Sequence, residues 1–163
     1  MNRLEVLKNA ILMERQGKIF YEQVAATTKS DAVRNIFAFM AKEEQVHIEQ
    51  LSEQYVHFLQ LNTFKVKEFL FEDTGFVKKI LTKGICHQIN AASYEAAAIS
   101  AAIDFESKAI EVYTRSALNA REFAEKAIFI WLAEWEKGHH RILNQLNEEL
   151  KEDIWFDNNF WPF

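Results

Sequence analysis

The chain repeats itself, and this internal duplication limits its fold more than any other feature of the sequence. Residues 41–51 and residues 133–143 share one pattern, Ala-x-x-Glu-x-x-His-x-x-x-Leu. Each half supplies one glutamate and, thirty residues later, a Glu-x-x-His motif. The offset of 92 residues that relates the two motifs also aligns Ile11 with Ile103, Glu14 with Glu106, Tyr21 with Tyr113, Ala25 with Ala117, Ile36 with Ile128 and Phe37 with Phe129.

The composition favours long helices in one domain. The 163 residues include only four Gly and one Pro, and that Pro is residue 162, so few positions would break a helix. A hydrophobic fraction of 49% is enough to build a core in a chain of this length. We therefore expect a single all-α domain.

Charge and cysteine content exclude several classes of protein. A net charge of −5 argues against nucleic-acid binding, which needs a basic face. No apolar run is long enough to span a bilayer, and the N-terminus lacks the apolar segment of a signal peptide. Cys86 is the only cysteine, so this chain cannot form an internal disulfide or a site of several thiolates. We expect a protein of the reducing cytoplasm with no membrane partner.

Capping and periodicity signals divide the chain into two helical hairpins. The first helix is expected from the N-cap Asn2 to about Thr28, and the second from the turn at residues 29–31 to about Leu61. The third is expected from about Ser93, and the fourth from about residue 121 to residue 150. Short connections make each pair antiparallel. On the first helix we expect the inward stripe to be Leu4, Leu7, Ile11, Glu14, Tyr21 and Ala25.

Two segments lie outside the hairpins. Residues 63–92 contain Gly75 and Gly84 and are expected to form a long crossover between a first hairpin at 1–62 and a second at 93–150. Residues 151–163 form a C-terminal tail, with five aromatic residues between 155 and 163. We expect these rings to cover one end of the bundle of residues 1–150 or to contact a second subunit.

The Glu-x-x-His motifs place charge on apolar faces. Glu44 and His47 are about one turn apart, so their side chains leave the same face of the helix as Phe37 and Met40. A single such pair is more often a surface ion pair than a metal site. The second copy at Glu136 and His139 favours the metal site.

The hairpin geometry brings these side chains together. Glu14 and Glu44 are equally far from the turn at residue 29, so they face each other, and the glutamates of the second half have the same relation. Four buried carboxylates would repel one another, whereas two divalent ions would balance their charge. Carboxylate oxygens mixed with imidazole suit iron or manganese, with zinc as an adventitious occupant. The predicted ligands, which would also be the catalytic residues through the metals, are Glu14, Glu44, His47, Glu106, Glu136 and His139.

Two tyrosines accompany the predicted ligands. Tyr21 and Tyr113 follow the first glutamate of each half by seven residues and lie on the same helix face. They are interpreted as hydrogen-bond partners of the ligands, with plain core packing as the alternative. The remaining histidines have no duplicated partner and are expected on the surface or in loops: His57, His87 and His140.

The motifs resemble those of the ferritin-like superfamily, and most closely its short rubrerythrin-like members. Residues 14–21 and 106–113 are similar to the family signatures of helices 1 and 3, and residues 41–47 to that of helix 2. The resemblance covers nearly all of residues 1–150 and implies a ferritin-like four-helix bundle with a di-iron centre. It also implies ligand roles: Glu44 and Glu136 as bridges, Glu14 and Glu106 as terminal ligands, and His47 and His139 each on one metal.

Two features depart from rubrerythrins proper. Ala109 stands where those proteins carry a further glutamate, one turn after the third-helix ligand, and one cysteine leaves no paired Cys-x-x-Cys motifs for a rubredoxin domain. The predicted ligand set is therefore closer to the symmetric site of bacterioferritin.

Three functions fit this reading. The first is an oxidoreductase of the peroxidase or ferroxidase type, in which two iron ions per chain reduce peroxide or dioxygen with electrons from an external donor protein. The second is a ferritin-like or bacterioferritin-like ferroxidase that stores iron. The third is a non-enzymatic, metal-stabilised interaction module. A homodimer or another small homo-oligomer is expected for the leading function.

Overall fold

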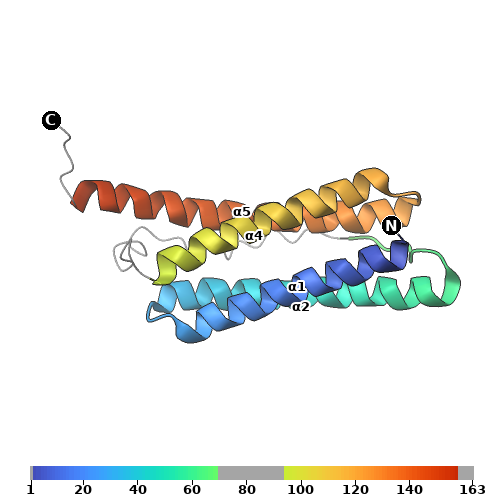
Figure 1. Cartoon of the computed structure of the whole chain (residues 1–163), viewed down its shortest axis with the longest axis horizontal. Helices are drawn as coiled ribbons and strands as arrows, with labels where there is room; N and C mark the ends of the chain where they lie inside the picture. The colour runs from blue at the N-terminus through green and yellow to red at the C-terminus, as the bar shows by residue number, and fades with distance from the viewer. Residues whose placement is uncertain (1, 70–93, 158–163) are drawn as a thin grey trace.

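The only regular secondary structure in the described part of the chain is α-helix. The computed structural model describes residues 2–69 and 94–157, with side chains up to residue 151. Its elements are α1 (Arg3–Thr27), α2 (Asp31–Leu61), α4 (Tyr94–Asn119) and α5 (Phe123–Asp157). Figure 1 shows two antiparallel hairpins, α1 with α2 and α4 with α5, lying along each other as a four-helix bundle. The predicted all-α bundle of two hairpins is confirmed.

The predicted caps define the first hairpin. The Asn2 side chain accepts a hydrogen bond from the Leu4 amide at 3.2 Å, and Glu5 reaches back to the Asn2 amide at 3.4 Å, which completes a capping box. Ser30 caps α2 by accepting from the Val33 amide at 3.3 Å. These caps fix where the two helices of the first hairpin begin.

The last helix is longer than expected. α5 continues to Asp157 instead of ending near residue 150. The reason is local, because residues 151–157 contain neither Gly nor Pro and so give the helix no signal to stop. Part of the expected tail is therefore helical. Residues 158–163, and with them the end of the tail, lie outside the described residues.

The start of the expected crossover packs against the bundle. The Gln54 side chain of α2 binds both backbone groups of Lys65, at 2.9 and 3.0 Å. Phe64 is buried against Phe58, and Phe69 stacks on Trp131 of α5 with ring centroids 5.1 Å apart. Residues 63–69 therefore pack against both α2 and α5. Residues 70–92 of the expected crossover lie outside the described part of the chain.

The inward stripe of α1 differs from the expected one. Ile11 and Ala25 are only half-buried, whereas Ala10 and Val24 are fully buried. α1 faces two neighbours, α2 and α4, so its buried face is wider than a single row of residues seven apart. Leu7, Glu14 and Tyr21 are buried as predicted.

The buried glutamates and histidines at the middle of the bundle separate the core into two apolar clusters. One cluster surrounds Tyr21, Phe37 and Leu143, and the other surrounds Tyr113 and Phe129. Along every helix, the predicted ligands lie between residues of the two clusters. Among the described helices, none combines the length and the hydropathy needed to cross a bilayer.

Candidate metal centre

All six predicted ligands meet in the middle of the bundle. Glu14 comes from α1, Glu106 from α4, and the two Glu-x-x-His motifs from α2 and α5. None of the six residues exposes more than 2% of its surface. They form two overlapping groups whose donor atoms lie within 4.8 Å of one another: Glu14, Glu44, His47 and Glu136 in the first, and Glu44, Glu106, Glu136 and His139 in the second.

The first group surrounds the imidazole of His47. Its Nδ1 lies 2.9 Å from Glu14 Oε2, 3.2 Å from Glu44 Oε2 and 3.1 Å from Glu136 Oε1. One nitrogen therefore faces carboxylates from three different helices, α1, α2 and α5. A nitrogen with three oxygens around it is the donor set that a transition metal would use.

The second group repeats this arrangement around His139. Its Nδ1 lies 3.1 Å from Glu136 Oε2, 3.3 Å from Glu106 Oε1 and 3.5 Å from Glu44 Oε1. Glu44 and Glu136 belong to both groups. Each of them directs one carboxylate oxygen toward His47 and the other toward His139. Two sites that share two carboxylates fit a dinuclear metal centre.

Several donor atoms at the centre are buried without a hydrogen bond. They include both nitrogens of His139, both carboxylate oxygens of Glu136 and Oε1 of Glu44. Leaving such atoms unpaired is costly inside a protein. Metal ions would satisfy them, so the residues present fit a dinuclear group.

Neither lysine nor arginine among the described residues neutralises the centre. In the described part of the chain, no Lys or Arg forms an ion pair with any of the four glutamates. Lys18, the nearest candidate by sequence, instead binds Gln45 at 2.9 Å and Glu22 at 3.5 Å. The negative charge of the carboxylates must therefore be balanced by protons or by metal ions.

Burial and mutual repulsion separate the pKa values of the glutamates. Burial raises the pKa of Glu14 well above its usual range, with the charges of Glu44 and Glu136 adding to the effect. Burial and the charge of Glu136 raise the pKa of Glu106 to about 8. Burial also acts on Glu44, but close contacts with Glu14, His139 and His47 lower its pKa below the usual range.

The neighbouring carboxylates raise the pKa values of the two histidines. Burial alone would lower the pKa of His47, but the charge of Glu136 and hydrogen bonds to the surrounding carboxylates raise it well above its usual value. Burial would also lower the pKa of His139, but the charge of Glu106 and close contacts with Glu136 and Glu44 raise it well above its usual value. Protons on these groups therefore provide the positive charge that metal ions would supply.

Two tyrosines link the hairpins at this centre. Tyr21 of α1 donates a hydrogen bond to Glu106 of α4, and Tyr113 of α4 donates one to Glu14 of α1. Burial and the nearby charges of Glu106 and Glu44 raise the pKa of Tyr21, which keeps its hydroxyl protonated. Each tyrosine thus donates to a predicted ligand, and each hydrogen bond joins the tyrosine of one half to the glutamate of the other.

Two tryptophans also touch the centre, and sequence reasoning missed both. Trp131 and Trp135 of α5 lie with ring centroids 5.4 and 5.9 Å from that of His47. The sequence feature that could have revealed them is their spacing: Trp131, Trp135 and His139 follow one another at intervals of four residues and so share one helix face. The duplication did not reveal them, because their counterparts are Phe39 and Glu43.

The other two described histidines lie outside the centre. His57 is half-buried on α2 and belongs to neither group of donor atoms. His140 is half-buried on α5, and its ring binds the side-chain amide of Asn144 at 2.8 Å. His87 lies outside the described residues.

Comparison with known proteins identifies the family. The family model named Rubrerythrin matches residues 5–99 and, separately, residues 97–158. Comparisons with curated proteins and with solved structures gave no match. The two family matches together span most of the chain, including every residue of the candidate metal centre. The chain belongs to the rubrerythrin family of ferritin-like proteins.

Proposed function

We propose that this protein is a di-iron redox enzyme that reduces peroxide or dioxygen with electrons from a separate carrier protein. The observation that carries the proposal is the pair of buried Glu/His groups that share Glu44 and Glu136. Membership of the rubrerythrin family supports it further.

The ligand set assigns a role to each residue. Glu44 and Glu136 would bridge the two metals, because each belongs to both groups. Glu14 and His47 would complete one coordination shell. Glu106 and His139 would complete the other. Mixed carboxylate and imidazole donors favour iron, with manganese as the next choice and zinc as an adventitious occupant.

The chain's own residues prepare the centre for redox chemistry. When bound, a pair of ferrous ions would supply the two electrons that reduce one peroxide. The apolar clusters on either side of the centre exclude water from it. Tyr21 and Tyr113 hold the terminal glutamates in place and keep a proton beside them, on the hydroxyl oxygens that donate to Glu106 and Glu14.

Ferroxidase activity and iron storage form the second candidate. Ala109 is buried one turn after Glu106 and provides no extra carboxylate, so the two metal positions have equivalent ligands. Equivalent ligands are the feature that favours a ferroxidase, for which ferrous iron is the substrate.

Further parts of the proposal concern the protein's surroundings. An external electron donor follows from a chain with one cysteine, which cannot build a rubredoxin-type site of its own. A reducing cytoplasm suits a chain with that cysteine content. We propose a homodimer or another small oligomer as the working assembly, to be tested by the native mass of the metal-loaded protein.

Anaerobic loading with ferrous iron tests the metal content. Elemental analysis should find two iron ions per chain, and His47→Ala should lower this content. His57→Ala is the matched control, because it removes a histidine of the same helix that lies outside both groups, and it should change nothing. Equal losses in the two variants would rule out the proposed ligands.

Reaction with oxidants separates the two candidates. The loaded protein is mixed in stopped flow with hydrogen peroxide or dioxygen, and then supplied with excess ferrous iron in air. Rapid oxidation of the centre, with iron uptake ending near two ions per chain, would support the redox enzyme. Continued uptake into a soluble ferric mineral would favour storage instead.

A further inference from the structure

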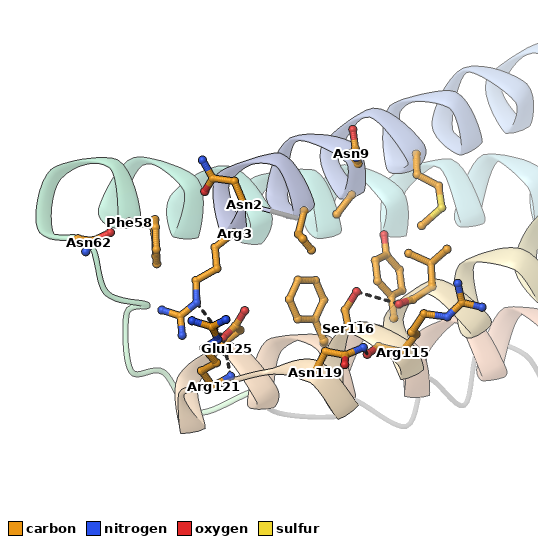
Figure 2. A pocket seen from close by; sticks show the side chains of 16 residues that line it. Asn2, Arg3, Asn9, Phe58, Asn62, Arg115, Ser116, Asn119, Arg121 and Glu125 are labelled. Carbon is orange, nitrogen blue, oxygen red and sulfur yellow. Dashed lines mark hydrogen bonds and ion pairs between the residues drawn. The ribbon is translucent and has the colours of Figure 1, made fainter.

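A cavity near the metal centre is not explained by the proposed redox activity. It has a volume of about 880 Å³ and lies between the N-terminal half of α1 and the C-terminal half of α4. Figure 2 shows Asn2, Arg3 and Asn9 on one side of the opening, with Ser116 and Asn119 on the other. Sites for small organic molecules commonly fall between about 300 and 1,000 Å³.

The duplication explains why this cavity is open. Tyr113 lines the cavity, and its counterpart in the other half is Tyr21. Around Tyr21, the rings of Phe20 and Phe105 fill the space, with centroids 5.6 and 6.3 Å from the tyrosine ring. The residues at the equivalent positions of the cavity are smaller, namely Val112 in place of Phe20 and Met13 in place of Phe105.

The cavity walls are also more polar than the equivalent region. Asn9 and Ser116 line the cavity, whereas the equivalent positions in the other half are Ala101 and Val24. Apolar lining remains at Val6, Ala10 and Phe129. A mixed lining of this kind suits a molecule with an apolar body and a polar head.

One positive charge at the cavity is available for a ligand. Arg3 already pairs with Glu122 at 2.5 Å and Glu125 at 3.4 Å, and Arg115 pairs with Glu111. Within residues 2–69 and 94–157, the guanidinium of Arg121 has no hydrogen bond or ion pair. An anionic head group is the natural partner for that guanidinium.

We propose that this cavity is a binding site for a small organic anion, with its apolar body between α1 and α4 and its acidic head on Arg121. The site goes beyond the proposed redox function and needs no metal for binding. Because Tyr113 lines the cavity and donates to Glu14, a bound molecule would touch the residue that connects the cavity to the metal centre.

Two fluorescent dyes test the site on the full chain. Anilinonaphthalene sulfonate has an aromatic body with an anionic head, and phenylnaphthylamine is its neutral relative. The wild-type protein should bind one anionic dye per chain, with an increase in fluorescence. A wild-type protein that binds no anionic dye would overturn the proposal.

Cavity-filling variants copied from the other half locate the binding site. Met13→Phe and Val112→Phe should each weaken dye binding by about tenfold or more, because they fill space that the body needs. Leu12→Phe adds the same ring on the exposed face of α1 and should leave binding unchanged. Circular dichroism and metal content check that each variant folds. Dye binding that survives in both folded filling variants would overturn the assignment to this cavity.

The anionic head is tested at Arg121. Arg121→Gln should weaken binding of the sulfonate dye by about tenfold and leave the neutral dye unaffected, because only the sulfonate loses a charge-assisted contact. Arg141→Gln removes an exposed arginine elsewhere on α5 and serves as the control. Equal effects of Arg121→Gln on both dyes would overturn the assignment of an anion.

Discussion

The outer and the shared glutamates carry different charges at this centre. In the absence of metal, burial raises the pKa values of Glu14 and Glu106, whereas contacts with the histidines keep Glu44 ionised. Burial also acts on Glu136, but contacts with His47 and His139 lower its pKa. The two shared carboxylates therefore stay charged, and the two outer carboxyls hold protons.

Metal loading should displace those protons. At pH 7 the raised pKa values leave one proton to be released by each of Glu14, Glu106, His47 and His139. Two divalent ions should therefore release about four protons per chain, and metal affinity should fall as the pH is lowered. Above pH 8 the release should decrease, because Glu106 has then already lost its proton.

Calorimetry of metal binding in buffers with different ionisation enthalpies measures this proton release. A release near zero at pH 7 would show that, without metal, the carboxyls are already ionised and the imidazoles are neutral. It would contradict the charge distribution while leaving the metal content to be judged separately.

The hydroxyl of Tyr113 should affect metal affinity without being a ligand. Tyr113→Phe removes the hydrogen bond that orients Glu14, and we expect a loss of about tenfold to hundredfold in metal affinity. Tyr21→Phe should act in the same way through Glu106. Competition with a chelating dye measures both. Tyr94→Phe is the control, since that residue is 47% exposed, and an effect of Tyr94→Phe as large as that of Tyr113→Phe would rule out a specific role.

At the scale of helices, the sequence was sufficient to predict which six side chains meet at the centre, but not which residues surround them. A spacing of three residues places Glu44 and His47 on one face, and the hairpin turn then aligns Glu14 with them. The pairing of Tyr21 with Glu106 depends on how the two hairpins approach each other, which no local pattern encodes. The contact of Trp131 with His47 depends on the same packing.

The two glycines in the described helices provide a matched test of helix packing. A Cβ at Gly17 would lie 2.7 Å from the Phe105 ring, whereas a Cβ at Gly138 would meet no atom within 4 Å. Gly138→Ala should stabilise the protein by about 1 kcal/mol, because alanine is the better helix former. Gly17→Ala should lose this gain and destabilise the protein, because α4 cannot move away without disturbing the core.

Thermal unfolding of the metal-free protein measures both changes. The comparison is internal, since each substitution adds the same methyl group within a helix. Equal stabilisation by Gly17→Ala and Gly138→Ala would mean that Phe105 yields freely and that α1 and α4 are not closely packed there.

At the scale of the whole molecule, the metal centre is where the hairpins meet. Glu14, Glu44 and His47 come from the first hairpin, and the other three candidate ligands come from the second. The cores on either side contain residues from both hairpins. Two bound metals would therefore crosslink the halves of the duplication in addition to any role in catalysis.

This crosslink predicts a large effect of metal on stability. Manganese or anaerobic ferrous iron at about a thousand times its dissociation constant should raise the free energy of unfolding by about 4 kcal/mol for each bound ion, and so by about 8 kcal/mol for two ions. For a chain of this size, about 8 kcal/mol corresponds to a rise of about 16 to 32 °C in the unfolding midpoint. A chelator should return the midpoint to that of the metal-free protein.

Replacement of the two protonated glutamates separates the crosslink from ordinary packing. Glu14→Gln and Glu106→Gln exchange a neutral acid for a neutral amide of the same shape, and each amide oxygen can still accept from its tyrosine. Without metal, the double variant should therefore unfold at nearly the same temperature as the wild type. It should lose most of the rise in the unfolding midpoint that metal causes. Glu148→Gln, on the exposed face of α5, should change neither the midpoint nor its rise. A full metal-induced rise in the double variant would show that the metals bind elsewhere, and a collapse of the metal-free fold would show that these carboxyls stabilise the bundle themselves.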